Sequence, residues 1–182
     1  LDPASKFDEV SDILIEDGKI VKIGKAIKEQ ADQTIQAEGC LVMPGFIDLH
    51  THLRDPGFEE KETIESGAKA AARGGFTTIL AMPNTSPVVD NADVVNYVHR
   101  KAKNLAAVNV LAIGAVTKGQ EGRELADIKG MVKAGIPAVS EDGKSVMDVS
   151  LYYQAMQAAK EEKIPVFAHC EDQTLVENGV MN

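Results

Sequence analysis

Two histidines separated by a single residue, His50 and His52, have the clearest chemical potential in this sequence. They follow a short, mostly apolar stretch, residues 45–49, which predicts a buried strand. Side chains two positions apart on a strand point to the same face, so the two imidazoles should leave the strand side by side. Paired imidazoles suit a divalent metal, zinc above all, and a zinc site with open positions is catalytic. Two partly buried histidines with polar partners are the simpler alternative.

The residues that follow the pair make the metal interpretation stronger. Arg54 carries a planar guanidinium that suits a substrate carboxylate, and its place beside the histidines favours that role. The alternative is a surface ion pair with one of three nearby acidic residues, Glu59, Glu60 or Glu62. Asp48 could orient a ligand imidazole or bond locally, and the two interpretations are equally supported.

Polar residues also follow three later apolar stretches. Asn84 could offer its amide to a substrate carboxylate or carbonyl, or form a local Asx turn. Asp142 could bridge two metal ions, although an Asp-Gly turn is the stronger interpretation from these residues alone. His169 would face the same edge as the first two histidines if the strands are parallel. Cys170 is expected to be a small buried residue, and His99, in the middle of a helix, to lie on the surface.

The elements that must position these side chains change character near Gly45. Before it, strands are expected at residues 13–15, 20–23 and 34–37, the first two around an Asp17-Gly18 turn. After it, apolar strands alternate with amphipathic helices. Those strands are expected at residues 45–52, 77–82, 108–115, 138–140 and 166–169. The helices are expected at residues 63–73, 93–104, 124–134 and 149–163, the second capped by Asp90 or Asn91.

This alternation predicts an α/β fold with a parallel sheet, either open and doubly wound or closed into a (β/α)8 TIM-like barrel. The polar residues sit at the C-terminal ends of four different strands, which favours the barrel, because an open sheet usually concentrates its chemistry at one crevice. A full barrel takes roughly 250 residues, so the residues after Pro44 suffice for only about the first half. We therefore expect the chain to be part of a longer polypeptide.

Composition narrows the classes of partner. The chain has 182 residues, 44% hydrophobic and 26% charged, which is a globular composition. A formal net charge of -9 argues against nucleic acid as a partner. A long apolar run is missing, so no membrane span is expected, and the first residues show no signal peptide. The two cysteines form no disulfide framework, so we expect a cytoplasmic location.

Taken together, these residues resemble the amidohydrolase superfamily and, within it, the type I dihydroorotase family. The resemblance rests on motifs that follow one another in the family order. They are residues 44–57, 74–78, 82–85, 140–143 and 169–172. The first is the most specific, because it places Arg-Asp-Pro-Gly directly after the paired histidines and one leucine.

The resemblance implies a site with one or two zinc ions. His50 and His52 would bind the more buried ion, and His169 the second. Asp142 would bind metal and bridge if two ions are present, in the place where most of the superfamily has a carboxylated lysine. Glu141 is the competing assignment for that role, but Asp142 aligns better.

The resemblance also implies a reaction, the reversible cyclisation of N-carbamoyl-L-aspartate to L-dihydroorotate in pyrimidine biosynthesis. Arg54 and Asn84 would hold the substrate carboxylate, and the general base is expected beyond Asn182, so the chain alone should be inactive. Residues 44–182 would form the first half of the hydrolase barrel, and residues 1–43 part of a small β-sandwich domain. A homodimer is expected, and association with aspartate transcarbamoylase stays open.

Two alternatives remain. One is another cyclic-amide hydrolase, such as a dihydropyrimidinase, hydantoinase or allantoinase, although these relatives normally carry the carboxylated lysine. The other is a non-catalytic dihydroorotase-like partner of aspartate transcarbamoylase. Such partners lose metal ligands, whereas four candidate ligands are present here, His50, His52, Asp142 and His169.

Overall fold

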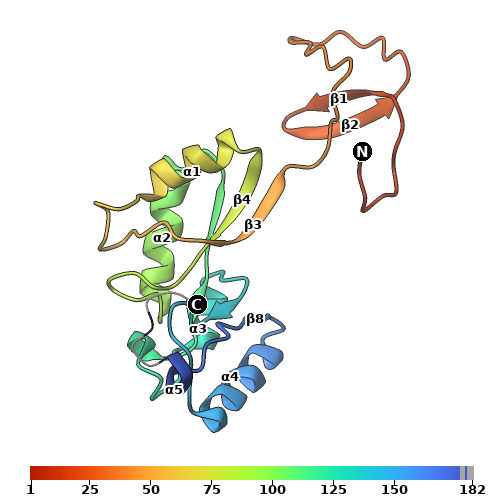
Figure 1. The fold of residues 1–182 in the computed structure, drawn as a ribbon. Helices are drawn as coiled ribbons and strands as arrows, with labels where there is room; N and C mark the ends of the chain where they lie inside the picture. The colour runs from red at the N-terminus through yellow and green to blue at the C-terminus, as the bar shows by residue number, and fades with distance from the viewer. Residues whose placement is uncertain (177–178, 180–182) are drawn as a thin grey trace. The chain divides into compact units, whose positions relative to one another are not determined.

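The computed structural model describes residues 1–176 and residue 179, and it divides the chain into two compact units (Figure 1). The first unit is Leu1–Pro44 and the second is Gly45–Asn182. That boundary lies one residue from the predicted one. The assignment of the first unit to part of a β-sandwich domain stays a prediction. The chemistry predicted above belongs entirely to the second unit.

The first unit is built around a β-hairpin. β1 (Asp12–Glu16) pairs antiparallel with β2 (Lys19–Gly24). The turn residues Asp17 and Gly18 have φ of 49° and 73°, the left-handed conformations that a tight two-residue hairpin needs. The strand predicted at residues 34–37 is wrong, because that segment joins no sheet in the described part of the chain.

The described part of the second unit contains two three-stranded parallel sheets. The first has the order β3 (Phe46–Thr51), β4 (Phe76–Ala81), β5 (Asn109–Ala112). The second has the order β6 (Gly114–Ala115), β7 (Val139–Ser140), β8 (Val166–Phe167). The predicted α/β class with parallel strands is confirmed. A closed barrel is not seen in residues 45–176, and that part of the fold prediction belongs to the proposals below.

The single strand predicted at residues 108–115 is interrupted at Ile113. The Ile113 N–H donates to the carbonyl of Ala81 at 2.9 Å, whereas the next N–H, of Gly114, donates to Ala138 at 3.1 Å. The backbone therefore leaves the first sheet and enters the second within two residues. The change of partner, not a change of hydropathy, ends β5, which is why the sequence pattern did not indicate it.

The helices begin at capping residues that satisfy their first free N–H groups. Thr63 caps α1 (Ile64–Arg73), and Asn91, one of the two predicted caps, begins α2 (Ala92–Leu105). Asp127 caps α3 (Ile128–Lys133), and Asp148 caps α4 (Val149–Glu161). The described residues also include two short helical segments, η1 (Lys118–Gln120) and α5 (Gln173–Val176).

The third helix starts later than the predicted residue 124. Leu125 bridges to Thr117, and the Ala126 N–H donates to the Val116 carbonyl at 3.0 Å. These backbone bonds hold residues 125 and 126 in an extended conformation, so Ile128 is the first helical residue.

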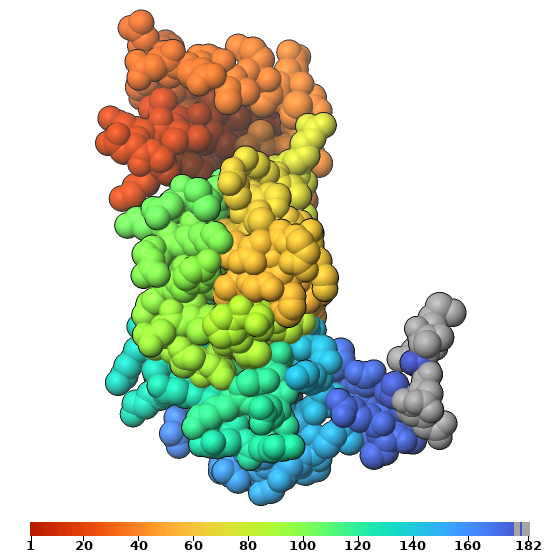
Figure 2. Space-filling model, turned by 90° about the vertical axis from the view of Figure 1, so that its left-hand side faces the viewer, coloured from red at the N-terminus to blue at the C-terminus, as the bar shows by residue number. Residues whose placement is uncertain are grey.

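The core lies between the helices and the sheets. Its fully buried members include Ile64, Ile79, Val95, Met131 and Val139. Helices α1 and α2 contact each other and pack against β4 and β5 of the first sheet. They appear in yellow and green in Figure 2. None of the helices in the described residues has the length and apolar character needed to cross a membrane.

The first strand of this unit is less covered than predicted. β3 pairs only with β4 among the described strands, so it is an edge. Phe46, Ile47 and Leu49 remain 53%, 60% and 54% exposed. The prediction of a buried strand at residues 45–49 is therefore wrong for the described structure, because no element covers that side.

Candidate metal centre

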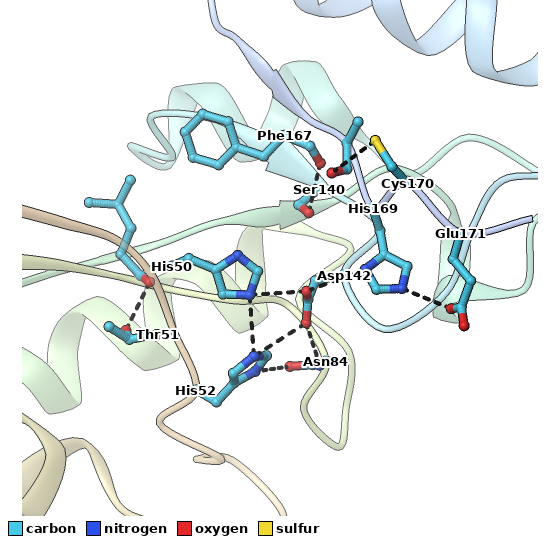
Figure 3. A network of polar contacts seen from close by, with 12 residues as sticks. His50, Thr51, His52, Asn84, Ser140, Asp142, Phe167, His169, Cys170 and Glu171 are labelled. Atoms are coloured by element: carbon cyan, nitrogen blue, oxygen red, sulfur yellow. Dashed lines mark hydrogen bonds and ion pairs between the residues drawn. The ribbon is translucent and has the colours of Figure 1, made fainter. Parts of the chain in front are cut away.

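The C-terminal ends of four parallel strands meet at one place. His50 and His52 lie at the end of β3, and Asn84 follows β4. Asp142 follows β7, and His169 follows β8. Figure 3 shows these five side chains turned toward one another. The strand ends converge as the sequence pattern predicted.

Strand geometry explains why both histidines point into this site. Thr51, between them, turns to the other side and donates its hydroxyl to the Leu80 carbonyl at 2.9 Å. Asp48 accepts the N–H of His50 at 3.0 Å, which is the local role allowed by the sequence. Because neighbouring side chains alternate, fixing Thr51 on β4 directs His50 and His52 together toward Asp142.

Three side chains offer ligand atoms to one point. The candidate atoms of His50, His52 and Asp142 all lie within 4.8 Å of one another. His50 Nε2 is 3.0 Å from Asp142 Oδ1, and His52 Nε2 is 3.5 Å from Asp142 Oδ2. The two Nε2 atoms are 3.3 Å apart. Two imidazole nitrogens and one carboxylate oxygen are ligand types that zinc accepts, so the residues fit the predicted metal.

His169 lies beside this cluster rather than within it. Its Nδ1 is 3.9 Å from Asp142 Oδ1, and its Nε2 is 2.9 Å from Glu171 Oε2. Glu171 was not among the predicted site residues. Its spacing of two from His169 carries the same alternation signal as the first histidine pair, and could have drawn attention to it.

The neighbouring carboxylates Glu141 and Asp142 have different partners. Glu141 is 3% exposed and accepts the N–H groups of Val116 and Thr117 at 2.9 and 3.1 Å, and the Thr117 hydroxyl. Burial raises the pKa of Glu141 despite these donors. Gln120 donates to the Asp142 carbonyl at 3.1 Å. Glu141 therefore anchors the loop, while the Asp142 side chain faces the histidines.

A buried ion pair anchors the loop that carries Arg54. The Asp55 side chain is fully buried and lies 2.8 Å from Lys101 Nζ of α2. This hydrogen-bonded carboxylate raises the pKa of Lys101. Asp55 also accepts the N–H of Ile64 at 3.4 Å, and Ser86 donates to the Pro56 carbonyl at 2.9 Å. Both α1 and the loop after β4 thus hold the backbone that presents Arg54.

The acidic partners considered for Arg54 do not pair with it. Among the described residues, Arg54 forms no ion pair with Glu59, Glu60 or Glu62. Its predicted substrate role stays a prediction, now without its main structural competitor.

Two predicted environments are wrong. Cys170 is exposed rather than buried, because β8 ends at Phe167, so the strand alternation used to bury it does not extend that far. His99 is half-buried rather than on the surface, and its Nε2 accepts the Ala112 N–H at 3.1 Å. His99 follows the buried Val98 on the side of α2 that packs against β5, and burial lowers its pKa.

Comparisons with known proteins identify the family to which this chain is similar. Residues 39–182 match the sequence model of the family described as Dihydro-orotase-like. A dihydroorotase of Clostridioides difficile (strain 630) is 50% identical over 183 residues, covering 100% of this chain and 43% of the relative. A dihydroorotase of Aquifex aeolicus (strain VF5) is 47% identical over 182 residues, again covering 100% and 43%. The chain thus spans less than half the length of these curated relatives.

Solved structures show the same arrangement of elements. An L-hydantoinase (dihydropyrimidinase) from Arthrobacter aurescens matches with a TM-score of 0.79 and 26% identity, covering 92% of this chain and 38% of that one. A D-hydantoinase structure matches with a TM-score of 0.73 and 29% identity over the same shares. The fold described above therefore corresponds to 38% of the chain in each of these two hydantoinase structures.

Proposed function

The chain belongs to the dihydro-orotase-like family of the amidohydrolase superfamily, and on that basis we propose that it is the N-terminal part of a zinc-dependent dihydroorotase. The complete enzyme would close the barrel and interconvert N-carbamoyl-L-aspartate and L-dihydroorotate. The observation that carries the proposal is the convergence of His50, His52 and Asp142 on one point, inside the family match.

His50, His52 and Asp142 would hold the zinc, with His169 available to a second ion. Zinc bound there would supply Lewis acidity toward the amide carbonyl and an activated water near neutral pH. The carboxylate of Asp142, 8% exposed, would balance the positive charge in a partly dry site. These ligands come from three different strand ends, so the proposed site would depend on the integrity of both sheets.

Arg54 and Asn84 would bind the carboxylate of the substrate. A guanidinium offers two parallel N–H groups to a carboxylate, and an amide adds a third donor. The buried Asp55–Lys101 pair anchors the residue that directly follows Arg54. We assign no general base to the described residues. In this proposal the base lies in the part of the enzyme that this chain does not span. That part is more than half of the length of the curated relatives.

A second candidate has support from the solved structures, which are hydantoinases and dihydropyrimidinases at 26% and 29% identity. The curated relatives at 47% to 50% identity are dihydroorotases, which favours the first proposal. Arg54 provides a physical distinction. Dihydroorotate carries a ring carboxylate for a guanidinium to bind, whereas hydantoin and dihydrouracil carry none.

The test uses the full-length protein that contains this chain, loaded with zinc, and a panel of dihydroorotate, dihydrouracil, hydantoin and allantoin. We expect hydrolysis of dihydroorotate, loss of turnover on chelation and its return with zinc. Arg54→Met should raise KM for dihydroorotate, whereas Arg123→Met, at an 84% exposed side chain, should leave it unchanged. Preference for hydantoin or allantoin would overturn the assignment.

The same preparation tests the proposed assembly. We propose a homodimer with a cytoplasmic location and leave room for association with aspartate transcarbamoylase. Light scattering of the full-length protein should give a dimer mass. A monomer that is active at all concentrations would contradict that part of the proposal.

A further inference from the structure

Asn84 lies between two of the candidate metal ligands. Its Oδ1 is 3.1 Å from His52 Nδ1, and its Nδ2 is 2.8 Å from Asp142 Oδ2 (Figure 3). The two partners come from different sheets, β3 and the end of β7. One half-buried amide therefore joins both halves of the cluster.

The hydrogen-bonding chemistry fixes which atom of the amide faces which partner. An ionised carboxylate only accepts hydrogen bonds, so the amide nitrogen must face Asp142. The amide oxygen then faces His52, and because that oxygen only accepts, His52 Nδ1 must carry the hydrogen. Each assignment follows from the previous one, and for the neutral imidazole they leave a single tautomer of His52.

This arrangement leaves the other nitrogen of His52 free to bind metal. With the hydrogen on Nδ1, the lone pair lies on Nε2. Nε2 is the atom that lies 3.3 Å from His50 Nε2 and 3.5 Å from Asp142 Oδ2. The partner of Nδ1 thus selects the tautomer whose free nitrogen points into the ligand cluster, as partners of ligand histidines generally do.

We propose that Asn84 is a positioning residue of the metal centre, holding His52 in its metal-binding tautomer and orienting Asp142 through one amide. This inference rests on the proposed assignment of the cluster as a zinc site, and it adds to the substrate contact proposed for Asn84. The amide retains one N–H and one oxygen lone pair for that contact. Asn84 would then couple substrate binding to the ligands themselves.

The experiment measures zinc affinity rather than turnover. Full-length, metal-free protein is titrated with zinc against a chromophoric chelator, for wild type and Asn84→Ala. Loss of the partner of a ligand should weaken zinc binding about 10- to 100-fold. The matched control is Asn109→Ala, whose amide donates to Thr78 Oγ1 at 3.3 Å near the starts of β4 and β5. The control should bind zinc as wild type does.

A second readout follows the histidine directly. Nitrogen-15 NMR of the metal-free protein should show His52 with its hydrogen on Nδ1 in wild type, and a mixture of tautomers in Asn84→Ala. If Asn84→Ala does not fold, as judged by circular dichroism, Asn84→Ser is measured in its place. Serine keeps a hydroxyl but is too short to reach both partners.

The outcomes separate this inference from the proposed function. Equal zinc affinity and an unchanged tautomer in the Asn84 variant, with a raised KM for dihydroorotate, would show that the amide serves the substrate alone and would overturn the inference. Weaker zinc binding in the variant, with no dihydroorotate turnover by zinc-loaded wild type, would sink the proposed function and leave the positioning role supported. Absence of zinc binding by wild type would overturn both.

Discussion

Adjacent carboxylates illustrate how local partners assign different tasks to similar residues. Glu141 faces the Val116 and Thr117 backbone, whereas Asp142 faces His50 and His52. The sequence could not separate them by chemistry, because both are acidic residues at the end of the same strand. Because neighbouring side chains alternate, the two carboxylates point to opposite sides. The loop between β6 and η1, which contains Val116 and Thr117, shows that Glu141 is the one with the structural role.

Replacing Glu141 should therefore weaken the fold and, through Asp142, the metal site. In Glu141→Gln the amide oxygen can keep the two backbone N–H groups while its NH2 turns to the Thr117 hydroxyl, but the bonds lose the strength that a charged acceptor gives, so we expect a loss of about 1 kcal/mol in the free energy of unfolding. Urea denaturation of the metal-free full-length protein measures it. The control is Glu121→Gln, at a side chain 64% exposed, which should change stability little. Equal midpoints for both variants would contradict this role.

His99 leads to a prediction about pH. Burial holds its pKa below the usual value, so the folded protein favours the neutral ring, whose Nε2 accepts the Ala112 N–H. Its contribution to stability is present above the unfolded pKa of about 6.5 and is lost as the pH falls through the lower folded pKa. One proton limits the slope to about 1.4 kcal/mol per pH unit.

The measurement compares unfolding free energies at neutral and mildly acidic pH for wild type and His99→Gln. The wild type should lose more stability on acidification than the variant, because only it takes up this proton on unfolding. Parallel pH profiles would contradict the assignment.

The sequence placed His99 on the surface because its neighbours Arg100 and Lys101 are charged, and the packing of α2 on β5 overrides that local signal.

At the scale of elements, a buried ion pair joins the Arg54 loop to α2. The Asp55 side chain is 0% exposed, whereas that of Lys101 is 30% exposed. Lys101→Met would leave a buried carboxylate without its cation, which typically costs about 3–5 kcal/mol. Lys69→Met is the control, because its 2.6 Å pair with Glu65 lies on the exposed face of α1 and should contribute only about 0.5 kcal/mol.

Thermal and urea unfolding of the full-length protein would measure both variants. Adding Asp55→Asn to Lys101→Met should recover part of the lost stability, since it removes the stranded charge. If Lys101→Met were no more harmful than Lys69→Met, the pair would not anchor the loop. No local pattern indicates this partnership, because Lys101 lies 46 positions from Asp55 in the sequence.

Most elements of the second unit were predictable because local chemistry marks them. Thr63 and Asn91 cap helices at the positions where their side chains can accept backbone N–H groups. The errors share one physical cause, dependence on partners distant in sequence. Within the described part of the chain, residues 34–37 pair with no strand, and the backbone at Ile113 changes partners between two sheets. Hydrophobic pattern alone specifies neither event.

At the scale of the whole molecule, the described sheets have open edges. β3 and β8 each pair on one side only within residues 45–176, and β3 leaves large apolar side chains exposed. The sequence predicted only about the first half of a barrel, and the chain spans 43% of the length of a curated relative. The convergence of the candidate ligands His50, His52 and Asp142, by contrast, is already present in this part, because it needs only the ends of β3 and β7.

We therefore expect a polypeptide of these 182 residues to bind zinc but not to turn over dihydroorotate, and to associate through its exposed edges. Zinc titration, a turnover assay and light scattering would examine these points, with the full-length protein as the control. Robust zinc-dependent turnover by the 182-residue polypeptide alone would contradict the expectation, since it would place a complete catalytic apparatus within these residues.

The crossing at Ile113 has a consequence for how the molecule would open. At this position the backbone itself connects the two sheets. The candidate ligands are divided between the same sheets, with His50 and His52 on the first and Asp142 on the second. An ion bound by all three side chains would be a second connection between the two sheets and would resist separation of the sheets. Metal binding should then slow hydrogen exchange at the amides of Ile113 and Gly114, which donate to the carbonyls of Ala81 in the first sheet and Ala138 next to the second.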